Sequence, residues 1–207
     1  MIPVHIGVED LLSEAVVRRL LLECSGHYAV GEVFNRGGFG YLRKTVRGWN
    51  RAAAGVPFVL LTDLDSKYPC PLALIQDWLQ EPQSPNLLFR IAVQEVESWL
   101  LADRTNLAAF LRVSPKLLPD DPEAIADPKA ALIQIAAKSR QRDLRDGIVP
   151  RKNSTAIIGP DYNGVLSKFV AAHWDPGAAS RRATSLKRAL ESLKTFTPQW
   201  PKADGAV

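Results

Sequence analysis

The chain has 207 residues, of which 46% are hydrophobic and 23% are charged. This composition is typical of a soluble globular protein and excludes a disordered or collagen-like chain. No apolar run is long enough for a transmembrane helix, and the N-terminus lacks the features of a signal peptide. We therefore expect a cytoplasmic protein without a membrane partner. Cys24 and Cys70 are the only cysteines, and their spacing indicates neither a disulfide framework nor a zinc site.

The first half of the chain alternates short apolar runs with amphipathic segments. We predict strands at residues 2–8, 28–34, 56–63 and 86–93, and helices at residues 11–23, 41–54, 72–79 and 95–103. The unbroken apolar run of the third strand is typical of the centre of a parallel sheet. The alternating order predicts a parallel, doubly wound α/β sheet, similar to a Rossmann sheet, in a domain of residues 1–104.

The second half has helical patterns and no further strand pattern. We predict helices at residues 105–113, 128–139, 162–173 and 176–194. Asp127 and Pro128 suit the N-cap and first position of the second of these, and Leu186, Leu190 and Leu193 mark one apolar face of the last. These patterns predict a helical appendage of residues 105–207 packed on the α/β domain.

Carboxylates follow three of the predicted strands. Ligands of a parallel sheet bind beyond the carboxyl ends of its strands, and neighbouring strands lie about 5 Å apart. Singly, these acids are ordinary helix-start or turn residues, but together they predict one cluster that needs a cation. Carboxylate oxygens favour Mg²⁺ or Mn²⁺ over zinc. The predicted metal ligands are Glu9 after the first strand, Asp63 and Asp65 after the third, and Glu95 and Glu97 after the fourth.

The spacing of Glu95 and Glu97 restricts how both can face one metal. Residues two apart on an α-helix point about 200° from each other. In place of a strand that ends at residue 93 and a helix that begins at residue 95, we therefore predict that Gln94 and Glu95 complete the strand and that Glu97 begins the helix. The bend at this junction would turn both carboxylates toward the cluster, with Trp99 packed behind.

At these residues the sequence resembles the TOPRIM fold of topoisomerases, primases and overcoming-lysogenization-defect nucleases, which has a Glu after the first strand and an Asp-x-Asp after the third. The segment QEVESWLLAD also resembles compact bacterial TOPRIM-like proteins, often of unknown function and often found with defence genes. The resemblance spans about residues 4–103. It implies a Mg²⁺-dependent nuclease or nuclease-like phosphodiesterase, active in phage or plasmid defence, with Glu9, Asp63 and Asp65 as catalytic residues. Because the chain has no P-loop motif, an ATPase would be a separate partner.

Basic residues gather around the glycine-rich segment NRGGFG, in a chain of net charge +4. Arg43, Lys44 and Arg47 share one side of the helix that follows it. With Arg36 before the glycines and Lys67 beyond the Asp-x-Asp, they predict contacts with nucleic-acid phosphates, DNA being favoured over RNA. An exposed, solvated helix face is the alternative interpretation.

Two other functions stay open. A TOPRIM-like scaffold would bind nucleic acid or a partner protein without cleaving, which suits the absence of the usual glycine after Glu9. A haloacid dehalogenase-type phosphatase would use an Asp-x-Asp nucleophile, but that family has a Thr at the position of Lys67 and a later Asp-Asp pair, whereas Asp120 and Asp121 lie between prolines. Tyr162 is predicted to be a packing or capping residue.

Overall fold

The computed structural model describes residues 1–24, 26–35, 37–64 and 67–200. Within them, one four-stranded, all-parallel sheet has the order β2-β1-β3-β4, which confirms the predicted parallel α/β class. The strands are β1 (Ile2–Gly7), β2 (Tyr28–Phe34), β3 (Phe58–Asp63) and β4 (Leu87–Ala92).

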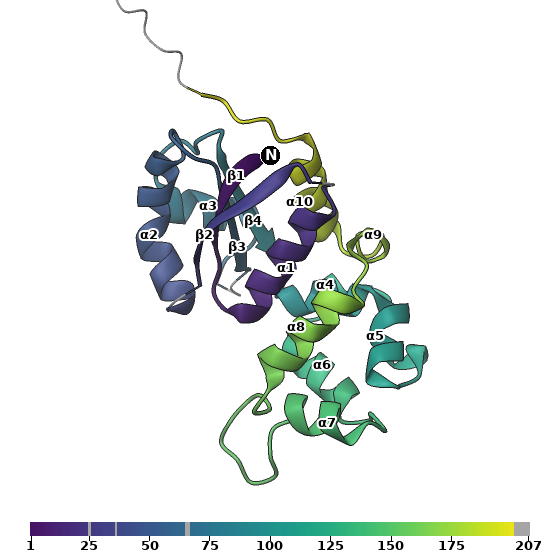
Figure 1. The fold of residues 1–207 in the computed structure, drawn as a ribbon. Helices are drawn as coiled ribbons and strands as arrows, with labels where there is room; N and C mark the ends of the chain where they lie inside the picture. The colour runs from purple at the N-terminus through teal and green to yellow at the C-terminus, as the bar shows by residue number, and fades with distance from the viewer. Residues whose placement is uncertain (25, 36, 65–66, 201–207) are drawn as a thin grey trace, which may run out of the picture.

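Helices cover both faces of the sheet (Figure 1). Helix α1 (Leu11–Leu22) packs in the apolar cluster that includes Val59 and Leu61 of β3. Helices α2 (Gly38–Ala52) and α3 (Pro71–Leu79) pack in a second cluster, with Phe58 and Leu60. Since alternate residues of β3 are buried under different helices, the strand is apolar at each position from Phe58 to Leu61.

The chain reverses its direction of winding between β1 and β3. From β1 it passes through α1 to β2 at one edge, and from β3 it passes through α3 to β4 at the other. The carboxyl ends of β1 and β3 therefore form the topological switch point of the sheet, where open α/β sheets bind their ligands.

The described residues of the second half are helical and contain no strand. In Figure 1, α4 to α8 gather beyond the carboxyl end of the sheet, whereas α10 returns to lie beside it. One apolar cluster contains residues of both halves, from Val4 of β1 to Phe196. The division into two domains near residue 105 therefore stays a prediction. The helices are α4 (Val96–Ala102), α5 (Arg104–Leu111), α6 (Pro128–Ala136), α7 (Arg142–Ile148), α8 (Tyr162–Ala172), α9 (Pro176–Ala179) and α10 (Thr184–Thr195), with short 3-10 turns η1 (Pro115–Leu117) and η2 (Pro122–Ala124).

The single helix predicted at residues 176–194 is wrong, because this segment forms α9 and α10. Asp175 caps α9 by accepting the Ala178 N–H at 2.9 Å. The carboxylate of Glu123 accepts the Thr184 and Ser185 N–H groups at 2.8 and 2.9 Å, which caps a new helix start. The predictions also miss α7, which is short and contains a glycine.

Helix α2 begins within the glycine-rich segment instead of after it. Gly37 has a φ of 98° and Gly38 already belongs to the helix. The left-handed conformation at Gly37, which favours glycine, thus turns the chain directly into α2. Among the described helices, none has the length and apolar character needed to cross a membrane.

Candidate metal centre

Four of the five carboxylates predicted after the strands are described, and they lie near the switch point of the sheet. Glu9 follows β1, and Asp63 is the last residue of β3. Glu95 is the N-cap of α4, and Glu97 lies in its first turn. Asp65 lies outside the described residues.

One oxygen from each of Asp63, Glu95 and Glu97 lies within 4.8 Å of the others. We call these three residues the acidic cluster. Two oxygens bound to one Mg²⁺ at about 2.1 Å are about 3 to 4.2 Å apart, so the three oxygens would move closer together to share a single ion. The donor set is purely carboxylate, as Mg²⁺ and Mn²⁺ prefer.

A bend before α4 lets Glu95 and Glu97 face the same point. Glu95 has extended backbone, with φ −138° and ψ 162°, and the helix begins at Val96. Because β4 ends at Ala92, the prediction that Glu95 completes the strand is wrong: Glu95 belongs to the connection. Trp99 is fully buried behind the bend and donates its indole N–H to Ser185 Oγ at 2.7 Å.

Lys129, which was not among the predicted site residues, neutralises part of the acidic cluster. Its Nζ lies 3.2 Å from Glu95 Oε1 and 3.6 Å from Glu97 Oε1, and its backbone N–H donates to Glu95 Oε2 at 2.9 Å. Lys129 follows Pro128 in the first turn of α6, where the helix dipole disfavours a cation. A Lys directly after an Asp-Pro helix start was therefore a signal for nearby carboxylates.

Tyr162 connects the helical half to the most buried acid of the cluster. Glu97 is 3% exposed, and its Oε1 accepts the Tyr162 hydroxyl at 2.8 Å. The prediction of a packing residue is correct about burial, since Tyr162 is 2% exposed, but it missed this hydrogen bond. Burial, followed by the charge of Glu97, raises the pKa of Tyr162, so its hydroxyl stays a donor.

Glu9 contacts the acidic cluster through the end of β3. Its Oε1 accepts the Thr62 hydroxyl and, at 3.2 Å, the Asp63 N–H. Asp63 Oδ1 in turn accepts the Val96 N–H at 2.9 Å. These hydrogen bonds join the ends of β1 and β3 to the start of α4 and fix the orientation of two carboxylates.

The electrostatics of the site are those of crowded, buried acids. Burial raises the pKa of Glu9. Burial, followed by the charges of Glu97 and Glu9, raises the pKa of Asp63 well above its usual range, and burial raises that of Glu97. Burial opposes the charged form of Lys129, but the charges of Glu97 and Glu95 outweigh it and raise the Lys129 pKa. The acids therefore favour a bound proton or cation.

The Asp that closes the QEVESWLLAD segment has a structural role. Asp103 is 2% exposed, and its carboxylate accepts the Asn106 N–H at 3.3 Å and the Asp175 N–H at 2.8 Å. It thus caps α5 and connects it to the residue that caps α9.

The predicted phosphate-binding residues have different surroundings. Arg43 pairs with Asp77 at 3.0 Å, and Arg47 Nη1 donates to the Gln80 side chain at 3.3 Å. Lys44 and Lys67 are exposed, and Lys67 Nζ lies 5.5 Å from the centre of the Tyr68 ring. Arg36 lies outside the described residues. The pairing of Arg43 with an acid reduces the positive potential of this face.

Comparisons with known proteins identify no family. No family model, no curated protein and no solved structure matches the chain. The resemblance to TOPRIM proteins therefore stays a prediction.

Proposed function

We propose that the protein is a Mg²⁺- or Mn²⁺-dependent nuclease or nuclease-like phosphodiesterase that acts on nucleic acid. The observation that carries this proposal is the convergence of Asp63, Glu95 and Glu97 at the switch point of a parallel sheet. The TOPRIM-like sequence features supply the expected reaction, and a role in phage or plasmid defence, with a separate ATPase as partner, is part of the same proposal.

The acidic cluster suits a divalent cation because its charges are incompletely balanced. Three carboxylates face the single ammonium of Lys129, and burial raises the pKa of Asp63 and Glu97. When bound, the ion supplies electrostatic stabilisation of a phosphoryl group.

Among the residues that the structure describes, Lys129 is best placed to contact a substrate phosphate. It lies beside the carboxylates, yet its side chain is 32% exposed, so an anion can reach it from solvent. An ammonium fixed at this position stabilises negative charge that develops on a phosphoryl oxygen. Glu9 and Tyr162 position the carboxylates and exclude water from the buried side of the cluster.

A cavity of about 380 Å³ lies beside Lys129. It is bounded by α6 and by the connection between α7 and α8, which carries exposed Arg151 and Lys152. A polyanionic strand in this cavity would contact Lys129. The cavity is lined by Asp127, Lys129, Ala130, Ile133, Gln134 and Ile157.

A non-catalytic scaffold is the second candidate. Its support is that Lys129 already pairs with two carboxylates, an arrangement that joins α6 to the start of α4 without a metal. No observation favours the phosphatase, because Asp120 pairs with Arg104 at the surface and Asp63 is engaged by the Val96 N–H.

Replacing Asp63 with Asn tests the metal centre. Asn keeps an acceptor for the Val96 N–H but removes a charge, so we expect Mn²⁺ affinity measured by calorimetry to fall at least about tenfold, which is about 1.4 kcal/mol. Mg²⁺-dependent cleavage of DNA should fall with it. The control is Glu191→Gln, which removes an exposed carboxylate from α10. Unchanged Mn²⁺ affinity in a folded Asp63→Asn protein would refute the site, and Mg²⁺-independent DNA binding without cleavage would favour the scaffold.

Removing Arg43 and Arg47 together tests the predicted phosphate contacts of α2. We expect the slope of log affinity against log salt for duplex DNA to decrease by up to about 1.8, equally for unrelated sequences, since each phosphate contact contributes about 0.9. Because Arg43 already pairs with Asp77, we expect the decrease in slope to be smaller than this limit. Binding that is unaffected, or lost for one sequence alone, would exclude this role.

A further inference from the structure

The outer edge of β4 carries peptide groups that no strand covers among the described residues. β4 is the last strand of the sheet and pairs with β3 alone. The carbonyls of Asn86 and Ala92 accept the N–H groups of Phe58 and Leu64. Since peptide directions alternate along a strand, the peptide groups of Phe89 and Ile91 point to the open edge.

Side chains close this edge at both ends. Gln83 Nε2 donates to the Leu87 carbonyl at 2.6 Å, and the Val93 N–H donates to Ser185 Oγ at 3.2 Å. Between them lies a cavity of about 270 Å³, which we call the edge cavity. Its volume is close to the lower limit, roughly 300 Å³, of small-molecule sites.

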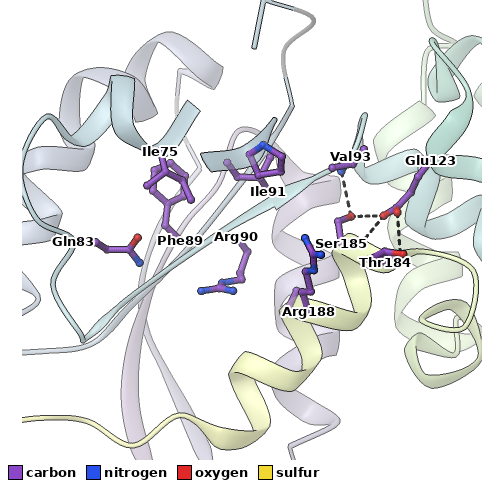
Figure 2. A pocket seen from close by; sticks show the side chains of 12 residues that line it. Ile75, Gln83, Phe89, Arg90, Ile91, Val93, Glu123, Thr184, Ser185 and Arg188 are labelled. Atoms are coloured by element: carbon purple, nitrogen blue, oxygen red, sulfur yellow. Dashed lines mark hydrogen bonds between the residues drawn. The ribbon is translucent and has the colours of Figure 1, made fainter. Parts of the chain in front are cut away.

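The walls of the edge cavity combine apolar and cationic side chains (Figure 2). Ile75 of α3 and Phe89 and Ile91 of β4 form an apolar wall on one face of the sheet. On the opposite face, the Arg90 side chain extends from β4 toward α10, and the Arg188 side chain extends from α10 toward β4.

Arg90 is a cation in an apolar setting without an acid. Its Nη1 donates to Ser192 Oγ at 2.8 Å, but its buried Nε has no hydrogen-bond partner, and no carboxylate among the described residues pairs with it. Burial lowers the pKa of Arg90. The side chain is partly buried, and a cation that is partly desolvated without a counter-ion is unfavourable for the fold. An anionic ligand would relieve this cost.

The other charged side chains around the edge cavity do not neutralise Arg90. Arg188 is exposed and lines the cavity. Among the described residues of the lining, the one acid is Glu123. Its carboxylate already accepts the Thr184 N–H, the Ser185 N–H and the Ser185 hydroxyl.

We propose that the edge cavity binds a small organic anion. The carboxylate or phosphate of the ligand pairs with Arg90 and Arg188, because guanidinium groups match both kinds of oxyanion. Its apolar part contacts Ile75, Phe89 and Ile91. A small ligand fits better than an added peptide strand, since the open stretch of edge is closed by Gln83 and Ser185. This inference is independent of the proposed nuclease function.

The test follows the side-chain Nε–H resonance of Arg90 in ¹⁵N-labelled protein during titration with phenyl phosphate, benzoate, inorganic phosphate and benzyl alcohol. We expect the two aromatic anions to shift this resonance at lower concentration than inorganic phosphate, and the neutral alcohol to leave it unchanged. The preference between phenyl phosphate and benzoate distinguishes the two headgroups.

Variants of the two guanidiniums complete the test. Arg90→Gln and Arg188→Gln should each weaken binding of the preferred anion about tenfold or more, as measured by calorimetry. Arg188 is on the surface, so its variant stays informative if Arg90→Gln fails to fold. The control Lys187→Gln removes an equal charge from the same helix, outside the cavity lining, and should leave affinity unchanged.

Three results would overturn the proposal. The first is that no anion shifts the Arg90 resonance at millimolar concentration. The second is that Lys187→Gln weakens binding as much as Arg188→Gln, which would show a general charge effect. The third is that an acetylated peptide of alternating Val and Glu shifts the amides of Phe89 and Ile91 while the small anions do not, which would assign the edge to an added strand.

Discussion

Replacing Lys129 with Met is expected to lower the free energy of unfolding by about 2–4 kcal/mol at pH 7, because it leaves Glu95 and Glu97 without their cation. Met preserves much of the apolar stem that packs at the start of α6. Removing one partner of a fully buried ion pair usually costs about 3–5 kcal/mol. We expect a smaller loss here because the Lys129 and Glu95 side chains are 32% and 25% exposed. Urea unfolding of both proteins measures the difference.

The loss caused by Lys129→Met should depend on pH with a definite sign. The pKa values of Asp63 and Glu97 are raised in the folded protein, and removal of the ammonium raises them further. Groups with a raised folded pKa contribute stability that is fully present below their unfolded pKa and is lost as the pH rises through the folded value. We therefore expect the variant to approach the wild type in stability as the pH falls below about 4.

The same variant separates a metal centre from a purely structural ion pair. A divalent cation at the acidic cluster would replace the missing charge, so Mn²⁺ should raise the melting temperature of Lys129→Met more than that of the wild type. Cleavage should nevertheless be lost, because the ammonium that would contact the phosphate is gone. The surface variant Lys187→Met is the control. If Mn²⁺ stabilises neither protein, Lys129 is simply the counter-ion of the acidic cluster.

The sheet could be predicted because its strands are local patterns. The apolar run that ends at Asp63 and the segment of residues 28–34 mark two strands by composition alone, and their alternation with helices indicates a parallel sheet. Helix ends were less predictable where the decisive cap is remote. The start of α10 depends on Glu123, which lies in a different part of the chain.

The carboxylates of the site could be predicted, but their partners could not. Asp63 ends a strand and Glu9, Glu95 and Glu97 follow one, and chain connectivity brings the carboxyl ends of strands to one edge of a parallel sheet. Lys129 and Tyr162 both contact the Glu97 carboxylate, from α6 and α8. The apolar periodicity of the sequence predicts that these helices form, but not where they pack. Only the unfavourable placement of Lys129 at a helix start pointed to the acids that it pairs with.

Replacing Glu97 with Gln is expected to stabilise the metal-free protein while weakening its metal binding. Gln has nearly the same shape and keeps an acceptor for the Tyr162 hydroxyl, but it removes a charge from the most buried position of the acidic cluster. Relief of repulsion with Asp63, whose pKa is raised by burial and then by Glu97, should increase the free energy of unfolding by about 1 kcal/mol at pH 7. Denaturant unfolding in chelator measures it.

The gain from Glu97→Gln should disappear in acid. Below the ordinary pKa of a glutamate, Glu97 of the wild type is protonated in both the folded and the unfolded protein. Wild type and variant then carry the same charge at this position, so the charge no longer contributes to their difference in stability. Mn²⁺ affinity measured at neutral pH should fall at least about tenfold, equivalent to about 1.4 kcal/mol, because one of three ligands loses its charge.

Tyr162→Phe is the matched control for Glu97→Gln. It retains the carboxylate but removes its buried donor, so it should lower the free energy of unfolding by about 1–2 kcal/mol. If Glu97→Gln raises the free energy of unfolding and Tyr162→Phe lowers it, the charge of Glu97, and not its packing, is what destabilises the folded protein at this site. If Glu97→Gln destabilised the protein as Tyr162→Phe does and left Mn²⁺ affinity unchanged, Glu97 would be a structural partner of Lys129 and Tyr162, and the metal ligands would have to be sought among the remaining acids.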